Sequence, residues 1–390
     1  MPTAPVGNLI IHPRDNSLVV ATFGRGIWIL DDVGPLQALT ATSVKADATL
    51  ASITRGRQWA LYSPQAWYGY GTFFAPNPDF EPIISYYVRA GSSEEGEIRI
   101  TDAAGGLERT LRAPAVSGLN RVCWDMRMES VVPPEAPAAG RGAGGRGAGG
   151  RGGRGGGGRG GRGGGADSAA VADSAAPPAI PGGGWRGVCS GGAAGGGGGG
   201  GGRGGGPATG PLVLPGKYHV SIKLPGVASQ LAGDLTVEAD PIENLSVADR
   251  KGRYDAVMSV VALQKTLVGA RIAARALTGQ ADSIKMDLTV KSNGGSAAAD
   301  SLATRLTAIQ NEVNRVLNAA GGLMRPMESF PSVPTADQRQ QLAWATEDAT
   351  KVIAEINKMS QTTIPALYAK YATFAWPRKV AAVSAPTKQP

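Results

Sequence analysis

Two adjacent carboxylates, Asp31 and Asp32, are residues whose types and spacing could do chemistry. Paired carboxylates carry out acid–base work on glycosidic bonds. Adjacent residues of a strand point to opposite faces of a sheet, so this pair could not flank one bond. We therefore interpret the pair as a turn at the end of a strand, and we identify no catalytic residue in the sequence.

Histidine and cysteine are too few for most metal centres, since the chain has two of each. His12 precedes a proline at a predicted strand end, and His219 alternates with apolar neighbours and is expected to face solvent. Cys123 and Cys189 would either pair in an exported protein or remain free thiols, and the sequence leaves both open. The sequence contains no P-loop, zinc-protease motif, nucleophile elbow or dinucleotide-binding loop. We therefore expect the protein to bind no cofactor and no metal.

A run of glycine and arginine fills the middle of the chain, with 35 of the 58 glycines between residues 136 and 206. Eight arginines and two aspartates there supply six of the formal net charge of +8. Arginine–glycine segments bind RNA through charge and stacking. Six candidate polyanion contacts are Arg141, Arg146, Arg151, Arg154, Arg159 and Arg162. Because the run has a single aromatic residue, Trp185, we favour a disordered insertion over a specific nucleic-acid site.

Aromatic side chains cluster in WALYSPQAWYGYGTFF, residues 59–74. Aromatic rings at such density either stack on sugars or pack one domain against another. The candidates for sugar or partner contact are Trp59, Trp67, Tyr68 and Tyr70. Both interpretations stay open from the sequence.

Short apolar runs separated by turn residues predict β-structure in the first 240 residues. Strands at 8–12, 17–22 and 27–31 form a meander, which needs another element to pack against. Six further strands are expected at 82–88, 97–102, 107–112, 119–127, 217–224 and 234–240. Their spacing predicts an immunoglobulin-like β-sandwich, interrupted by the glycine–arginine insertion, whose ends would be held while its middle is free.

From residue 246 onward, the hydrophobic period becomes helical and predicts an antiparallel helical bundle. Ser246 with Asp249 and Thr335 with Gln338 mark two helix starts. The expected helices cover 246–277, 299–319 with a stop at Gly321-Gly322, 336–359 and 364–373. No run of 18 apolar residues predicts a membrane span, and MPTAPVGNL lacks the features of a signal peptide.

The segment VGNLIIHPRDNSLVVATFGRGIWILDDVGPL, residues 6–36, resembles the final blade of bacterial sortilin-like proteins with BNR-type β-propellers, often labelled glycosyl hydrolases. The motifs GLNRVCWDMR, LPGKYHVSIKLPG and PTADQRQQL are similar to downstream parts of that family. The resemblance implies export and a propeller upstream. A propeller has four to eight blades of four strands, whereas this chain carries three strands of one. The Asp-box repeat is missing from the sequence, so no hydrolase residue can be transferred.

The sequence thus predicts a multidomain chain of β and α parts. The expected parts are a remnant of the last propeller blade (1–37), the first part of a β-sandwich (55–127), a disordered Gly/Arg-rich insertion (128–210), the last strands of the sandwich (211–241), a helical bundle (245–376) and a disordered tail (377–390). We predict a non-catalytic accessory region that contacts the rest of the propeller and a protein or polysaccharide. The alternatives are a glycosyl hydrolase with its active site in the missing blades and an Arg/Gly-rich nucleic-acid-binding protein.

Overall fold

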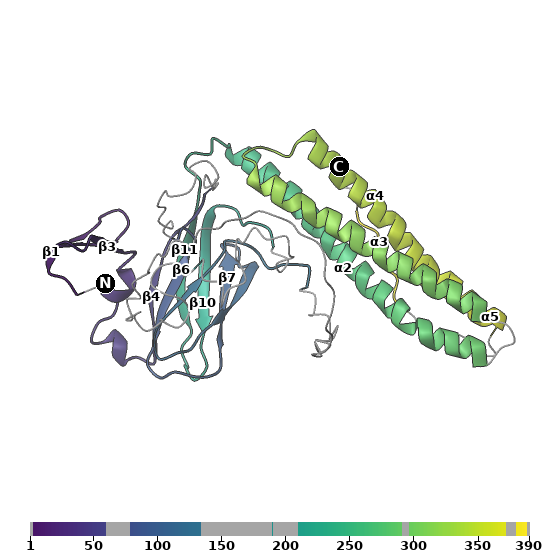
Figure 1. The fold of residues 1–390 in the computed structure, drawn as a ribbon, viewed down its shortest axis with the longest axis horizontal. Coiled ribbons are helices and arrows are strands. Elements are labelled where there is room, and N and C mark those ends of the chain that lie inside the picture. The colour runs from purple at the N-terminus through teal and green to yellow at the C-terminus, as the bar shows by residue number, and fades with distance from the viewer. Residues whose placement is uncertain are drawn as a thin grey trace, which may run out of the picture.

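The computed structural model describes residues 3–59, 79–133, 189, 210–290, 296–371 and 380–387. Small sheets come first, and long helices extend away from them (Figure 1). The expected mixture of β and α parts is therefore confirmed. The predicted disorder of the Gly/Arg-rich insertion falls almost entirely on residues outside the described ones.

The first sheet is an antiparallel meander of β1 (Val6–Ile11), β2 (Leu18–Thr22) and β3 (Ile27–Leu30), in the order β1-β2-β3. It confirms the three strands predicted there. Gly24 and Gly26 have φ of 70° and 80° in the β2–β3 turn, a conformation that side chains other than glycine disfavour.

Two strands that the sequence pattern did not predict follow the short helix α1 (Gly34–Gln37) and a 3-10 turn (Ser43–Lys45). They are β4 (Ala48–Ile53) and β5 (Gly56–Gln58). Every residue of β4 is half-buried, so the strand has no clear alternation between an apolar and a polar face. β5 has only three residues and pairs in parallel with β11.

Eight strands form two sheets with the orders β5-β11-β10-β7-β8 and β4-β6-β9. The remaining strands are β6 (Ile83–Val88), β7 (Gly96–Asp102), β8 (Leu107–Ala113), β9 (Gly118–Cys123), β10 (Gly216–Lys223) and β11 (Leu231–Ala239). These six match the predicted strands with small shifts at their ends. We call the pair of sheets the two-sheet unit.

One hydrophobic core joins the two sheets. Ile84 and Tyr86 from β6 meet Ile100, Val220 and Leu235 from the other sheet. Their burial follows from the period of two along each strand, which puts alternate side chains on the inner face. β10 pairs with β7 on one side and β11 on the other, so strands before and after the insertion belong to one sheet.

The C-terminal region contains α2 (Val247–Val290), α3 (Ser296–Ser329) and α4 (Ala336–Lys358), followed by a π-helical turn (Met359–Thr363) and α5 (Ile364–Tyr371). Their apolar faces share a core that includes Leu267, Val313 and Ile356. The predicted bundle is confirmed. Thr335 and Gln338 form the expected reciprocal capping box, and the Asp249 amide donates to Ser246 Oγ at 3.0 Å.

The predicted end of the second helix at Gly321-Gly322 is wrong, because α3 continues to Ser329 and passes Pro326. Tertiary packing outweighs the low helix propensity of these residues. Leu323, Met324 and Met327 are buried against α2 in a second cluster. A Cβ on Gly321 would lie 3.1 Å from Gln264 Nε2, so glycine allows the two helices to approach closely.

The prediction of a disordered tail does not hold for residues 380–387. The Asn357 side chain donates to the Val383 carbonyl at 2.9 Å and accepts from the Val383 amide at 2.9 Å. Val380 and Val383 also pack against the helical core. This exchange of two hydrogen bonds holds the segment along α4.

Within the described part of the chain, one helical segment, Val247–Asp287, is long and apolar enough to cross a membrane by length and composition. In the structure, 44% of its most apolar window is buried, and it packs against α3. A core helix of a water-exposed bundle meets the same criterion, so this segment is weak evidence for a span.

Candidate functional site

The candidate site is the junction where the chain leaves β9 for the insertion. Trp124 is fully buried, and its indole N–H donates to the Arg127 carbonyl at 2.9 Å. Met126 lies between them with φ of 54°, although it is not a glycine and is 3% exposed. Such a left-handed residue is strained and persists only where its surroundings hold it. The conformation of this turn is thus held by the buried residues around it.

The two ends of the insertion lie side by side at this turn. The Val213 amide donates to the Met126 carbonyl at 3.0 Å, and the Met128 amide donates to the Pro211 carbonyl at 2.8 Å. An antiparallel bridge pairs Arg127 with Leu212. These contacts confirm the prediction that the ends of the insertion are held by the folded strands.

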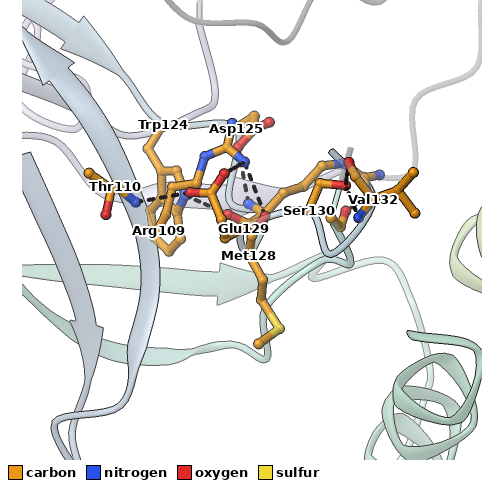
Figure 2. A network of polar contacts seen from close by, with 10 residues as sticks. Arg109, Thr110, Trp124, Asp125, Met128, Glu129, Ser130 and Val132 are labelled. Atoms are coloured by element: carbon orange, nitrogen blue, oxygen red, sulfur yellow. Dashed lines mark hydrogen bonds and ion pairs between the residues drawn. The ribbon is translucent and has the colours of Figure 1, made fainter. Parts of the chain in front are cut away.

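The Arg109 side chain and backbone groups of β8 contact the same turn (Figure 2). Arg109 Nη1 donates to the Met128 carbonyl at 3.2 Å and lies 3.7 Å from Glu129 Oε1. The Glu129 amide donates to the Glu108 carbonyl at 2.7 Å. Because these side chains are engaged mainly with backbone atoms, the network suits a structural role better than proton transfer.

Burial raises the pKa of two carboxyl groups near this turn. It raises the pKa of Asp125, and the nearby Arg109 opposes that shift without cancelling it. It also raises the pKa of Glu108, helped by the negative charge of Asp102. Desolvation is the larger cause in both cases, because a buried carboxylate loses favourable hydration.

Glu328 of α3 connects the helices to this junction. Arg127 Nη1 donates to Glu328 Oε2 at 2.9 Å and to the Gly210 carbonyl at 2.8 Å. The Leu212 amide donates to Glu328 Oε1 at 2.7 Å. One carboxylate therefore binds both ends of the insertion, and the helical region is fixed to the two-sheet unit through it.

A second ion-pair cluster lies where β11 leads into α2. Glu243 accepts from Arg250 at 2.8 Å and from Arg253 at 2.9 Å, and Arg253 also donates to the Phe330 carbonyl at 2.9 Å. A cavity of about 30 Å³ beside these arginines is lined by Gln58, Tyr254 and Glu328 among others. It has room for water but not for a sugar or nucleotide.

Of the four aromatic candidates, the structure describes only Trp59. Its ring is half-buried and lies 5.2 Å from the Arg57 guanidinium carbon in a cation–π contact. Arg57 in turn donates to Glu238 at 2.6 Å. Trp67, Tyr68 and Tyr70 lie outside the described residues, as do all six candidate polyanion contacts: Arg141, Arg146, Arg151, Arg154, Arg159 and Arg162.

The carboxylate pair at the end of β3 forms the expected turn. Asp32 has φ of 49°, and its Oδ1 accepts from the Gly34 amide at 3.0 Å. His12 Nδ1 lies 3.4 Å from Asp15 next to the β1–β2 turn. His219 is solvent-exposed as predicted, with Nδ1 3.3 Å from Asp234.

The cysteines form a disulfide, which the sequence had left open. Cys123 at the end of β9 is bonded to Cys189, and their Cα atoms are 5.2 Å apart. The bond closes a sequence separation of 66 residues. It anchors Cys189 of the insertion to the two-sheet unit.

No protein-family model, curated protein or solved structure matches this chain. Sequence reasoning missed Arg127 and Glu328 as a pair, because Glu328 lies beyond the predicted end of its helix. The motif GLNRVCWDMR marked this place, but only as the end of a strand.

Proposed function

We propose that this chain is the C-terminal accessory region of an exported sortilin-like BNR β-propeller protein, without catalysis of its own. It would cap the propeller and mediate contacts with a protein or polysaccharide. The observation that carries the proposal is the apolar meander β1-β2-β3, whose outer strands β1 and β3 are exposed, although Val20 of the central strand is buried. Because residues 6–36 resemble a last propeller blade, we propose that this sheet is part of the last blade of the propeller.

Both faces of the meander expose apolar side chains. Ile10 and Ile29 are 57% and 51% exposed and share one face, because Ile10 pairs with Val19 and Val19 pairs with Ile29. Leu9 and Trp28 are 58% and 40% exposed and share the other face through Val20. Apolar patches of this kind mark interaction sites.

The occupant that fits is the upstream part of the same polypeptide. A propeller blade lies between two neighbouring blades, so apolar residues are needed on both of its faces. A second copy of the chain docking on one face would leave the other uncovered. Among the residues that the structure describes, the meander has three strands instead of the four of a blade, and no further strand pairs with its outer strands β1 and β3.

Two further observations support parts of the proposal. The two-sheet unit, with its shared core, is compatible with the predicted immunoglobulin-like sandwich. The Cys123–Cys189 disulfide favours an extracytoplasmic location, because disulfides persist mainly in oxidising compartments.

The proposal is tested by binding of an apolar fluorescent dye to the 390-residue chain and to the protein isolated from its natural cells. We expect strong dye binding by the chain, reduced in the variant Ile10→Lys/Ile29→Lys, and weak binding by the natural protein. Ile272→Lys is the matched control, since Ile272 is 63% exposed on α2, a helix that lies away from the meander (Figure 1). Equal dye binding by both proteins would refute burial of the meander by upstream chain.

Ligand binding separates the alternatives. The accessory role predicts no turnover of β-glucans by the chain. Glycan hydrolysis by the 390 residues would overturn that role. Hydrolysis by the natural protein but not by the chain would favour the enzyme alternative, whose active site lies in the missing blades. Tight RNA binding that disappears on deleting residues 136–206 would establish the nucleic-acid alternative.

A further inference from the structure

Three side chains able to bind a metal meet at one end of the two-sheet unit. A carboxylate oxygen of Glu81 and the sulfur atoms of Cys123 and Cys189 all lie within 4.8 Å of one another. Each of these residues is half-buried, so an ion could reach them from solvent. Two sulfurs and one carboxylate form a ligand set that zinc accepts, with water in the fourth position.

Strand pairing places two of these ligands together. Ile83 of β6 lies opposite Cys123 of β9, and the Trp124 amide continues the ladder by donating to the Pro82 carbonyl at 3.1 Å. Glu81 therefore lies diagonally across from Cys123 on the same face. The register of two core strands fixes this arrangement, and the third ligand comes from the insertion.

Charged groups surround the Glu81 carboxylate. Asp79 and Asp125 act on it as negative charges, while Arg121 interacts with Asp79, and Arg109 and Arg127 interact with Asp125. Reduction of the disulfide and loss of two thiol protons would add two negative charges next to them. A divalent ion would offset this repulsion, as metal ions do when they are the largest charge in a site.

The two states of the sulfurs exclude each other. Tetrahedral zinc with Zn–S bonds of about 2.3 Å holds two sulfurs ~3.8 Å apart. Disulfide sulfurs are within bonding distance, at roughly 2.05 Å, and are no longer thiolates. The same pair can thus serve as metal ligands or as a disulfide, but not as both.

We propose that the reduced protein binds one Zn²⁺ ion through Glu81, Cys123 and Cys189, and that formation of the Cys123–Cys189 bond excludes the ion. A dithiol reductant delivers two electrons and two protons to the disulfide and becomes a cyclic disulfide itself. The ion then displaces two thiol protons. In a newly made chain the site would hold the two thiols together until they are oxidised. This inference does not depend on the proposed propeller.

The test uses the 390-residue chain, reduced with a dithiol and separated from it by gel filtration under argon. Co²⁺ is the probe, because thiolate ligation gives a near-ultraviolet charge-transfer band, and Zn²⁺ is then added to displace it. We expect one Co²⁺ per reduced chain and none bound by the disulfide form. Glu81→Gln should weaken binding by more than about tenfold, since even partners outside the ligand shell contribute that much.

Glu94→Gln is the matched control, because Glu94 is an exposed glutamate in the loop before β7. It should bind Co²⁺ like the unmodified chain. Circular dichroism of both variants without metal checks that they are folded. Absence of a charge-transfer band in the reduced chain would overturn the proposal. Equal affinity of the Glu81→Gln and Glu94→Gln variants would also overturn it, because thiols of an unfolded chain would bind in that way.

Discussion

Arg127 and Glu328 form an ion pair of 2.9 Å between the turn after β9 and helix α3. Their side chains are 18% and 7% exposed, respectively, so water screens the pair only weakly. Glu328 also accepts from the Leu212 amide, and Arg127 also donates to the Gly210 carbonyl. This pair ties the helical region to both ends of the insertion.

Replacing Glu328 by alanine should lower the free energy of unfolding by about 3 kcal/mol, because Arg127 and the Leu212 amide lose their buried partner. Urea denaturation followed by circular dichroism measures the change. Glu312→Ala is the control: Glu312 is 46% exposed and pairs with Arg315 on the surface, so its loss should cost below about 1 kcal/mol. Equal losses in the two variants would contradict the role of Glu328.

Replacing Gly322 by alanine should stabilise the protein by about 1 kcal/mol, because alanine is the better residue inside a helix. A Cβ at Gly322 would meet no atom within 4 Å. Thermal unfolding measures the effect. If α3 instead ended at this position, as the sequence pattern predicts, glycine would be favoured there and the same change would destabilise the protein.

Replacing Glu108 by glutamine should stabilise the protein at neutral pH. Burial raises the pKa of Glu108, and its buried Oε2 has no hydrogen-bond partner among the described residues. The folded state therefore binds the Glu108 proton more tightly than the unfolded state. Protonation of Glu108 therefore increases the free energy of unfolding as the pH falls from the raised pKa of the folded state towards the ordinary glutamate value. This stabilising contribution is lost again as the pH rises.

Free energies of unfolding, measured from pH 7 downward, should include this stabilising contribution of Glu108 protonation in the unmodified chain. The contribution should be smaller in the Glu108→Gln variant. Glu94→Gln serves again as an exposed comparison and should leave the pH profile unchanged. A Glu108→Gln variant less stable than the unmodified chain at pH 7 would show that the charged carboxylate is stabilising instead.

Replacing both Cys123 and Cys189 by serine should lower the free energy of unfolding by about 2–4 kcal/mol, because the bond restricts the unfolded chain. Urea denaturation without reductant measures the loss, and adding reductant to the unmodified chain should reproduce it. Free thiols in the unreduced protein, together with equal stability of the variant, would contradict the disulfide.

Strands and helices with a clear hydrophobic period could be predicted from the sequence, because the period reflects which face is buried. The strands at 217–224 and the helix after Thr335 are examples. β4 could not be predicted, since all of its residues are half-buried. The extension of α3 past Gly321-Gly322 depends on contacts with α2, which local propensity does not contain.

The candidate site was harder to predict for the same reason. Arg127 and Glu328 are 201 residues apart in the sequence and meet only through tertiary packing. The pairing of Cys123 with Cys189 depends on where the insertion returns to β9. By contrast, the turn at Asp31-Asp32 and the exposure of His219 follow from strand alternation alone, and both were predicted.

The most direct test of the proposed accessory role is the intact mass of this protein isolated from the cells that make it, with peptide mapping of its N-terminal side. We predict a mass well above the 39.8 kDa of the 390 residues, with upstream peptides that carry propeller repeats. A protein of 39.8 kDa that begins at Met1 would contradict the account, because nothing upstream would then cover the apolar meander.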